Sequence, residues 1–206
     1  MAQYQENERK NVSRGKISER ILRVILNDPS GVLSIYDIAK KAESSYSWTY
    51  DFLQKLQAMH LIENTRVKDY KALFKLWFEI RKKPKKRDYQ IRDALSVLKE
   101  TNMKYALTTY QAENLINKYL FPSRIDLYVY KNDWNKWKNF LLDKGLVGGG
   151  NFRLLIDDDH IFYKSFKKDN FTVVSIPQLI VDLYIEGGVA SEAADILIEK
   201  MVNTNV

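Results

Sequence analysis

The sequence predicts an α+β protein in two parts, a small N-terminal domain of helices and a larger C-terminal α/β domain with a mixed sheet. Two observations lead to this prediction. Residues 14–80 repeat apolar side chains at intervals of three and four, the period of helices that bury one face. Residues 91–206 alternate such segments with short apolar runs typical of strands, and several of these runs follow one another near the end.

The composition excludes several kinds of site. The 206 residues include no Cys, which rules out disulfides, thiolate metal ligands and a Cys nucleophile. Only two His occur, His60 and His160, so neither a metal nor another cofactor is expected. No apolar run approaches the roughly 18 residues that a membrane span needs. The polar start MAQYQENERKNVSRGK contains no signal segment, so we expect a cytoplasmic protein without a membrane partner.

The net charge of +7 is concentrated in the first half of the chain. Residues 1–100 hold 21 Lys/Arg and 13 Asp/Glu, a net charge of +8, whereas residues 101–206 hold 12 and 13, a net charge of −1. This asymmetry predicts a polyanionic partner. Nucleic acid is favoured over a membrane surface because the sequence shows no basic amphipathic helix.

A pair of helices is predicted between Ile35 and His60, after a first helix over residues 17–27 and one short strand that residues 32–34 could add. A short amphipathic segment runs into the polar turn Glu43-Ser44-Ser45, and a longer amphipathic segment follows. Two helices joined by such a turn form a helix-turn-helix unit, whose second helix is free to enter a DNA major groove. His60 is expected to be a structural cap at the end of that helix.

The next elements complete the order of a winged helix. Residues 61–68 are predicted to form a strand with alternating faces, and Asp69 is predicted to cap a helix over residues 70–80. The return strand of the wing is not evident, and the helix leaves room only for a short wing. We therefore predict a winged-helix DNA-binding domain over residues 14–80.

Residues 81–87, RKKPKKR, form the strongest charge run, with six basic residues among seven. Pro84 discourages a helix, so residues 81–90 are interpreted as a basic linker between the two domains. Two interpretations of its charge stay open. The side chains are either simply solvated at the boundary or neutralise phosphates.

The α/β domain is predicted over residues 91–206. Its expected helices cover residues 91–100, 109–119, 132–144, 177–185 and 191–202. Its expected strands cover residues 104–108, 124–130, 152–156, 161–166 and 171–174. The loop Gly148-Gly149-Gly150 lacks the spacing and the following helix of a dinucleotide site.

Two segments make the chain resemble a known family. They are YALTTYQAENLINKYLFPSRIDLYV at residues 105–129 and TVVSIPQLIVDLYIEGGVASEAADIL at residues 172–197. Both look like the AbiEi-type antitoxins, the regulators of type IV toxin–antitoxin systems, and the resemblance covers nearly the whole chain after residue 15. It implies a winged helix joined to an α/β domain, DNA binding, autorepression of an operon and antagonism of a nucleotidyltransferase toxin. Stand-alone members of the family exist, so a toxin is not required.

The C-terminal half also resembles a nucleotidyltransferase domain without its catalytic groups. Such enzymes carry Gly-Gly or Gly-Ser at a helix start and D-x-D on the next strand, whose carboxylates hold Mg²⁺. Here the helix start reads Thr108-Thr109-Tyr110 and the strand reads Arg124-Ile125-Asp126, so a cation replaces the first carboxylate. The resemblance therefore implies a nucleotidyltransferase-like fold with no catalytic residue and no metal ligand. The run Asp157-Asp158-Asp159 is expected to be a polar turn.

Ten residues are candidate DNA contacts. Side chains near the start of a recognition helix normally meet bases, Gln54 could pair with adenine, and cationic side chains neutralise phosphates. Asp51 lies among them and is repelled by DNA unless it contacts cytosine or pairs with a lysine. The alternative for each residue is a solvated helix face or, for the aromatic ones, packing between domains. The candidates are Lys40, Lys41, Ser45, Ser47, Trp48, Tyr50, Gln54, Lys55, Arg66 and Lys68.

These observations together predict a DNA-binding transcriptional regulator, an antitoxin-like autorepressor that is not an enzyme and whose C-terminal domain contacts proteins. The expected partners are double-stranded DNA, a cognate toxin protein and a second copy of the chain in a homodimer. The alternative is a Mg²⁺-dependent nucleotidyltransferase with a DNA-binding appendage, motivated by Asp126 and Asp157-Asp158-Asp159. A third hypothesis is an interaction module whose helix-turn-helix has no DNA partner.

Overall fold

The computed structural model describes residues 13–204 of the chain, so the polar segment 1–12 and the last two residues lie outside the described part. The chain divides between Arg81 and Lys82 into two compact units, called unit 1 and unit 2 below. Unit 1 is mainly helical and unit 2 contains a mixed seven-stranded sheet with helices. The predicted α+β class is confirmed.

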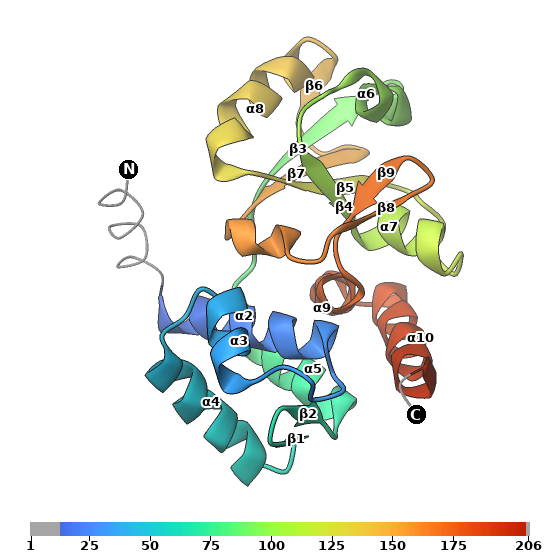
Figure 1. The fold of residues 1–206 in the computed structure, drawn as a ribbon. Coiled ribbons are helices and arrows are strands. Elements are labelled where there is room, and N and C mark those ends of the chain that lie inside the picture. Colours follow the sequence, from blue (N-terminus) through green and yellow to red (C-terminus); the bar gives the residue numbers. More distant parts are fainter. Residues whose placement is uncertain (1–12, 205–206) are drawn as a thin grey trace. The chain divides into compact units, whose positions relative to one another are not determined.

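Residues 13–81, the described part of unit 1, form four helices and a short hairpin (Figure 1). The predicted helix order is confirmed, with ends shifted by a few residues. Its core is formed by apolar side chains from every helix, and the buried guanidinium of Arg23 lies 5.2 Å from the ring centre of Trp77. The elements are α2 (Arg14–Asn27), α3 (Ile35–Lys41), α4 (Tyr46–Ala58), β1 (Ile62–Glu63), β2 (Arg66–Val67) and α5 (Tyr70–Ile80).

The turn between α3 and α4 is tightly specified. Ser34 and Asp37 form a reciprocal capping box at the start of α3. After α3, Glu43 adopts a left-handed conformation with φ of 52°. The N–H of Ser44 then donates to the carbonyl of Ala39, which closes the helix end. The carboxylate of Glu43 also accepts a 2.6 Å hydrogen bond from Arg20 of α2, so an ion pair ties this turn to the first helix.

The end of α4 has the same construction and confirms the structural role predicted for His60. The φ of His60 is 60°, its N–H donates to Gln57, and the next N–H, of Leu61, donates to Leu56. This pair of bonds satisfies the last carbonyls of the helix. Leu61 itself is buried and anchors the chain as it leaves the helix.

Residues 61–68 form a hairpin, so the prediction of one continuous strand is wrong. Ile62 pairs with Val67 and Glu63 with Arg66, and Asn64 turns the chain with φ of 55°. Residues 32–34 do not form a strand, because the isolated bridge to Arg66 is made by Ser30. Two short strands therefore stand where one was predicted, and Asn64 supplies the turn between them.

The predicted linker over residues 81–90 is wrong for most of its length. Arg81 caps the end of α5, and its buried guanidinium donates to Glu19 of α2 at 2.8 Å. Residues Lys85–Ile91 form strand β3, which pairs with both β6 (Gly145–Val147) and β7 (Phe152–Ile156). Strand pairing with partners far along the chain overrides the local charge pattern.

The boundary after Arg81 also changes the predicted distribution of net charge between the two halves of the chain. Residues 1–81 hold 14 Lys/Arg and 10 Asp/Glu, a net charge of +4. Residues 82–206 hold 19 and 16, a net charge of +3. The excess positive charge is therefore shared between the units, because the basic run belongs to the second.

Unit 2 is built on one mixed sheet with the strand order β6-β3-β7-β5-β4-β9-β8 (Figure 1). Strand β4 is parallel to β9, β5 is parallel to β7, and the other neighbours are antiparallel. The strands are β3 (Lys85–Ile91), β4 (Tyr105–Thr108), β5 (Ile125–Val129), β6 (Gly145–Val147), β7 (Phe152–Ile156), β8 (Phe166–Lys168) and β9 (Phe171–Val173). The helices are α6 (Ala94–Glu100), α7 (Thr109–Ile116), α8 (Trp134–Leu142), α9 (Ile176–Glu186) and α10 (Val189–Thr204), with 3-10 turns η1 (Lys131–Asp133) and η2 (Asp159–Phe162).

The predicted mixed sheet is confirmed, with two local corrections. Residues 161–166 are not a strand, because the turn η2 ends at Phe162 and strand β8 begins only at Phe166. Gly145 does not merely end a helix but begins β6. A Cβ on Gly145 would lie 2.2 Å from the carbonyl oxygen of Gln90, so only glycine fits at this place in the pairing of β6 with its neighbour β3.

Candidate functional site

The exposed face of α4 is the main candidate surface of unit 1. Thr49, Leu53 and Leu56 face the core and are buried. The opposite face carries exposed side chains at the helical interval. The predicted contacts Ser47, Gln54 and Lys55 all lie on this exposed face.

Two predicted contacts on α4 have structural partners. The hydroxyl of Ser45 is the N-cap and accepts a hydrogen bond from the backbone N–H of Trp48 at 3.2 Å. Trp48 is half-buried at the flank of the helix, and the guanidinium of Arg14 lies 5.5 Å from its ring centre. Helix capping gives Ser45 a structural role, and the cation–π contact with Arg14 gives Trp48 an intramolecular partner.

Aromatic rings form a second feature of the same surface. Tyr50, one of the predicted contacts, stacks with Tyr46 at a ring distance of 6.3 Å and an interplanar angle of 16°. Tyr46 is 53% exposed and Tyr36 of α3 is 65% exposed. Sequence reasoning missed both of these residues. The four-residue interval between Tyr46 and Tyr50 was the available signal, since it places two rings on one helix surface.

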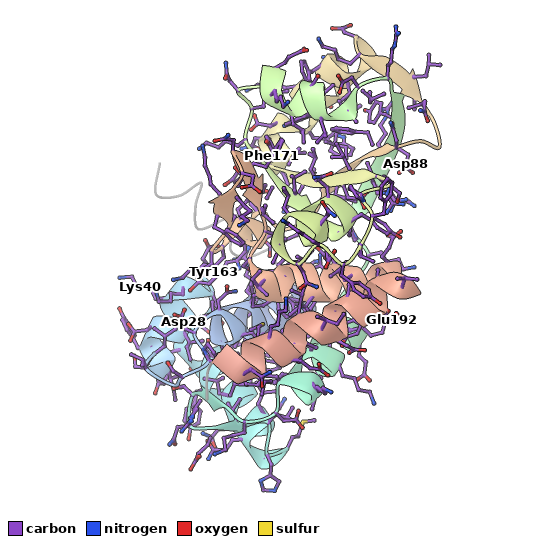
Figure 2. All side chains as sticks on the ribbon, turned by 90° about the vertical axis from the view of Figure 1, so that its right-hand side faces the viewer. Asp28, Lys40, Asp88, Tyr163, Phe171 and Glu192 are labelled. Atoms are coloured by element: carbon purple, nitrogen blue, oxygen red, sulfur yellow. The ribbon has the colours of Figure 1, made fainter. Side chains whose placement is uncertain are left out.

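The cationic candidates differ in their surroundings. Lys40, Lys55 and Arg66 are exposed and form no ion pair with a carboxylate of residues 13–204, and Figure 2 shows Lys40 at the surface of unit 1. Lys41 is also exposed. Lys68, in contrast, pairs with Glu63 across the hairpin at 3.0 Å. That bond and charge lower the pKa of Glu63, so its carboxylate is ionised at neutral pH.

The carboxylate of Asp51 lies on the exposed face of α4, where it would repel the phosphates of DNA. It is exposed and lies four residues before Lys55, but the two side chains form no ion pair. The net charge contributed by the two residues is zero, so the positive charge beside α4 comes from α3 and the hairpin. The helix face therefore carries polar and aromatic groups with no net charge, and further cations lie on the flanking segments.

A second cluster crosses the sheet of unit 2. Cross-strand partners place Thr108, Asp126, Arg153 and Asp88 in one row over β4, β5, β7 and β3. Residues opposite one another in a ladder project from the same face, so the row alternates negative and positive groups. Arg153 donates to Asp88 at 2.7 Å, while Arg124 donates to both oxygens of Asp126 at 2.6 and 2.8 Å.

Two carboxylates of α9 close the cluster. Asp182 is buried and accepts hydrogen bonds from Thr108, Tyr128 and Gln178. Glu186 accepts from Arg124 at 2.8 Å and from Arg153 at 3.3 Å. Burial alone would raise the pKa of Glu186, but the hydrogen bond and charge of Arg124, with the charge of Arg153, hold it below its usual range.

The strand-to-helix turn at Thr109 carries local backbone strain. Thr109 begins α7 with φ of 48°, an unusual conformation for a β-branched residue, and its hydroxyl donates to Asp126. The turn at Thr109 and the carboxylate of Asp126 are therefore in contact. They are the helix start and the strand position on which the resemblance to a nucleotidyltransferase domain is based. Asp126 is nevertheless engaged by Thr109 and Arg124.

The acidic run Asp157-Asp158-Asp159 does not join Asp126. Asp126 pairs with Arg153 on parallel strands, so Asp157 lies about 13 Å further along β7. Asp158 caps η2 and Asp159 accepts from the N–H of Lys131, which confirms the predicted turn role. Within residues 13–204, no group of three or more His, Asp or Glu side chains is arranged to hold a metal ion.

Comparisons of the chain with protein-family models, with curated proteins and with solved structures found no match. Among the described helices, none has both the length and the apolar character needed to cross a bilayer.

Proposed function

We propose that this protein is a DNA-binding regulator, in which α4 of unit 1 is the recognition helix of a winged helix and the β1–β2 hairpin is its short wing. One observation carries the proposal. An amphipathic helix follows a capped helix and a tight turn, buries one face, and presents Ser47, Gln54 and Lys55 on the other. Such a helix is able to enter a major groove, where amide and hydroxyl side chains contact base edges.

The flanking cations support a role for the same surface in phosphate binding. Lys40 and Lys41 end α3, and Arg66 lies in the hairpin. A recognition helix between two such segments would be oriented by phosphate contacts on both sides. Tyr36, Tyr46 and Tyr50 add exposed rings that suit packing against deoxyribose or a thymine methyl group.

For unit 2 we propose protein contacts rather than chemistry. Arg124 and Arg153 together donate four hydrogen bonds to Asp126 and Glu186. These carboxylates therefore already have partners within the protein. The function proposed for the whole chain is that of an antitoxin-like autorepressor, with a cognate toxin or a second copy of the chain as the partner of unit 2.

The test is a titration of the full-length protein against labelled duplex DNA from upstream of its own coding region, at several salt concentrations. Contacts by Lys40, Lys41, Lys55 and Arg66 would give a slope of log K against log salt of about −4. The double variant Lys40→Ala, Arg66→Ala should lower affinity more than tenfold and reduce the slope by about 2.

The matched control removes the same charge elsewhere in unit 1. Lys71→Ala, Lys75→Ala takes two exposed cations from α5, outside the helix pair and the hairpin. We expect this variant to bind the duplex within about threefold of the parent protein. Equal losses for the two double variants, or no duplex binding at low salt, would contradict the proposal.

The alternative function is Mg²⁺-dependent nucleotidyl transfer. Its supporting observation is the strained Thr109 turn beside Asp126. Incubation with Mg²⁺ and labelled nucleoside triphosphates tests it directly, with Asp126→Asn as the comparison. Transfer that disappears in this variant would favour the enzyme over the regulator.

A further inference from the structure

A large open cavity lies in unit 2 at the other end of β4 from Thr109. Its volume is about 770 Å³, and it is bordered by the end of α6, the start of β4 and the β8–β9 hairpin. Tyr105 in this cavity pairs with Val129, whereas Thr108 pairs with Asp126. The cavity and the carboxylate cluster are therefore separated by about 10 Å along the strand.

The charge in this cavity is not neutralised. Lys99, Lys104 and Lys167 line it, together with a single acidic residue, Asp169. None of the three ammonium groups forms an ion pair with a carboxylate in the part of the chain that the structure describes. This contrasts with the carboxylate cluster, where both arginines are paired. Unpaired cations from three separate segments favour an anionic ligand.

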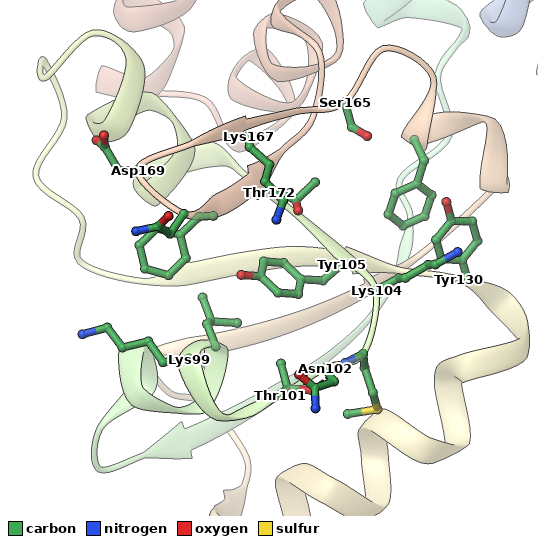
Figure 3. A pocket seen from close by; sticks show the side chains of 15 residues that line it. Lys99, Thr101, Asn102, Lys104, Tyr105, Tyr130, Ser165, Lys167, Asp169 and Thr172 are labelled. Atoms are coloured by element: carbon green, nitrogen blue, oxygen red, sulfur yellow. Dashed lines mark hydrogen bonds between the residues drawn. The ribbon is translucent and has the colours of Figure 1, made fainter.

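Aromatic rings lie between these cations. Figure 3 shows Tyr105 in the middle of the cavity, with Lys99 to one side, Lys104 to the other, and Lys167 reaching toward it from β8. At one wall Tyr130 stacks on Phe162, with ring centres 3.9 Å apart, and the ammonium of Lys104 lies 5.9 Å from the centre of the Tyr130 ring.

Tyr105 is available to a ligand. Its ring meets Trp137 at 88°, and no ring of residues 13–204 stacks parallel to it. Its hydroxyl has no hydrogen-bond partner in the same residues, and the ring is half-buried. Burial raises the pKa of the Tyr105 hydroxyl, so at neutral pH it is protonated and able to donate.

We propose that this cavity binds a short stretch of single-stranded nucleic acid. Its bases would stack on Tyr105 and its backbone would pass Lys99, Lys167 and Lys104. Cations spread along the cavity, rather than converging on one point, match a chain of phosphates, and a ring between them offers a sequence-tolerant platform. The hydroxyls and amides of Thr101, Asn102 and Thr172 line the cavity and suit contacts to base edges or sugars.

The experiment measures anisotropy of labelled oligouridylate and oligothymidylate of about ten nucleotides with the full-length protein. Strand β8 offers a matched pair, because Lys167 lines the cavity and the adjacent Lys168 does not. Lys167→Ala should weaken binding about tenfold, and Lys168→Ala should stay within about twofold. Tyr105→Phe should retain affinity, whereas Tyr105→Leu should lose about tenfold.

Three further arms complete the test. Lys86→Ala, beside the carboxylate cluster, should not change single-strand binding. The ratio of the RNA to the DNA affinity identifies which strand the cavity prefers through the 2′-hydroxyl. ATP should compete far more weakly than the oligonucleotide. Equal effects of Lys167→Ala and Lys168→Ala, or ATP competing as well as the oligonucleotide, would overturn the proposal.

This proposal stands apart from duplex binding by unit 1. The variant Lys40→Ala, Arg66→Ala should lose duplex binding and keep single-strand binding, while Lys167→Ala should do the reverse. Failure of one proposal is therefore distinguishable from failure of the other.

Discussion

Single side chains in unit 1 show how structural roles and binding roles compete for the same polar residues. Ser45, Trp48 and Lys68 suit DNA contact by residue type, but each has an intramolecular partner in the structure. Arg20 and Arg81 hold the unit together instead, through ion pairs with Glu43 and Glu19. Which cation pairs internally depends on distances across the fold, so residue type alone does not decide it.

The ion pair between Glu19 and Arg81 should be the most sensitive polar contact of unit 1. Both side chains are almost completely buried, so Glu19→Ala would remove the carboxylate that the guanidinium of Arg81 contacts at 2.8 Å. We expect the free energy of unfolding to fall by about 3 kcal/mol in a urea titration. Glu79→Ala on α5 removes an exposed carboxylate as the control and should cost less than about 0.5 kcal/mol. A loss below about 1 kcal/mol for Glu19→Ala would show that the pair contributes little.

Glu186 should make unit 2 sensitive to acid. Its pKa is lower in the folded protein than its ordinary value of about 4.3. The stabilisation from its ionised form is therefore complete above that value and is lost as the pH falls through the folded pKa. The free energy of unfolding in urea should be higher for the parent protein than for Glu186→Gln at pH 6. This difference should become smaller as the pH is lowered to 3. A constant difference across this range would exclude the ion pairs with Arg124 and Arg153 as its source.

At the scale of elements, local signals predicted the helices well and the strands less well. Apolar intervals and capping residues place α2, α3, α4 and α5 within a few residues of their ends. The hairpin was missed because its strands have only two residues each and its turn residue, Asn64, adopts a left-handed conformation. Strand β3 was missed because it contains few apolar side chains and pairs with distant segments. Helix bonds are local, whereas ladder bonds depend on a partner strand.

Substitution of the two serines at the start of α4 distinguishes a role in helix capping from a role in DNA binding. Ser45→Ala removes the N-cap and should cost about 1 kcal/mol in urea unfolding, while Ser47→Ala removes an exposed hydroxyl and should cost less than about 0.5 kcal/mol. Ser47→Ala should have the larger effect on duplex affinity. If Ser45→Ala instead weakens DNA binding without changing stability, the capping account of Ser45 is incomplete.

At the scale of the whole molecule, the division after Arg81 places most of the basic run of residues 81–87 in unit 2. Lys85, Lys86 and Arg87 belong to β3, so the two units carry similar net charges. Overall charge therefore does not single out unit 1 as the polyanion-binding part. The case for DNA rests on the placement of Lys40, Lys55 and Arg66 around one helix, and unit 2 has its own unpaired cations at the cavity around Tyr105.

Each unit should fold as a separate fragment, because each contains its own apolar core. We expect fragment 1–84 to show a cooperative thermal transition by circular dichroism and to bind the duplex with the salt dependence of the full chain. Fragment 82–206 should keep its own transition and the single-strand affinity. A fragment 1–84 without a cooperative transition would mean that unit 1 depends on unit 2 for its stability.

Local sequence patterns predicted the α+β class, the helix pair with its polar turn, the mixed sheet and the position of a cation, Arg124, two residues before Asp126. These follow from periodicity, caps and residue type, which act over a few neighbouring residues. The folded structure was needed to show that residues 85–91 form a strand and that Arg20, Arg81 and Arg153 have carboxylate partners. The same holds for the unpaired lysines that meet around Tyr105. Such pairings join segments far apart in the chain, so the distances that create or neutralise a site exist only in the folded protein.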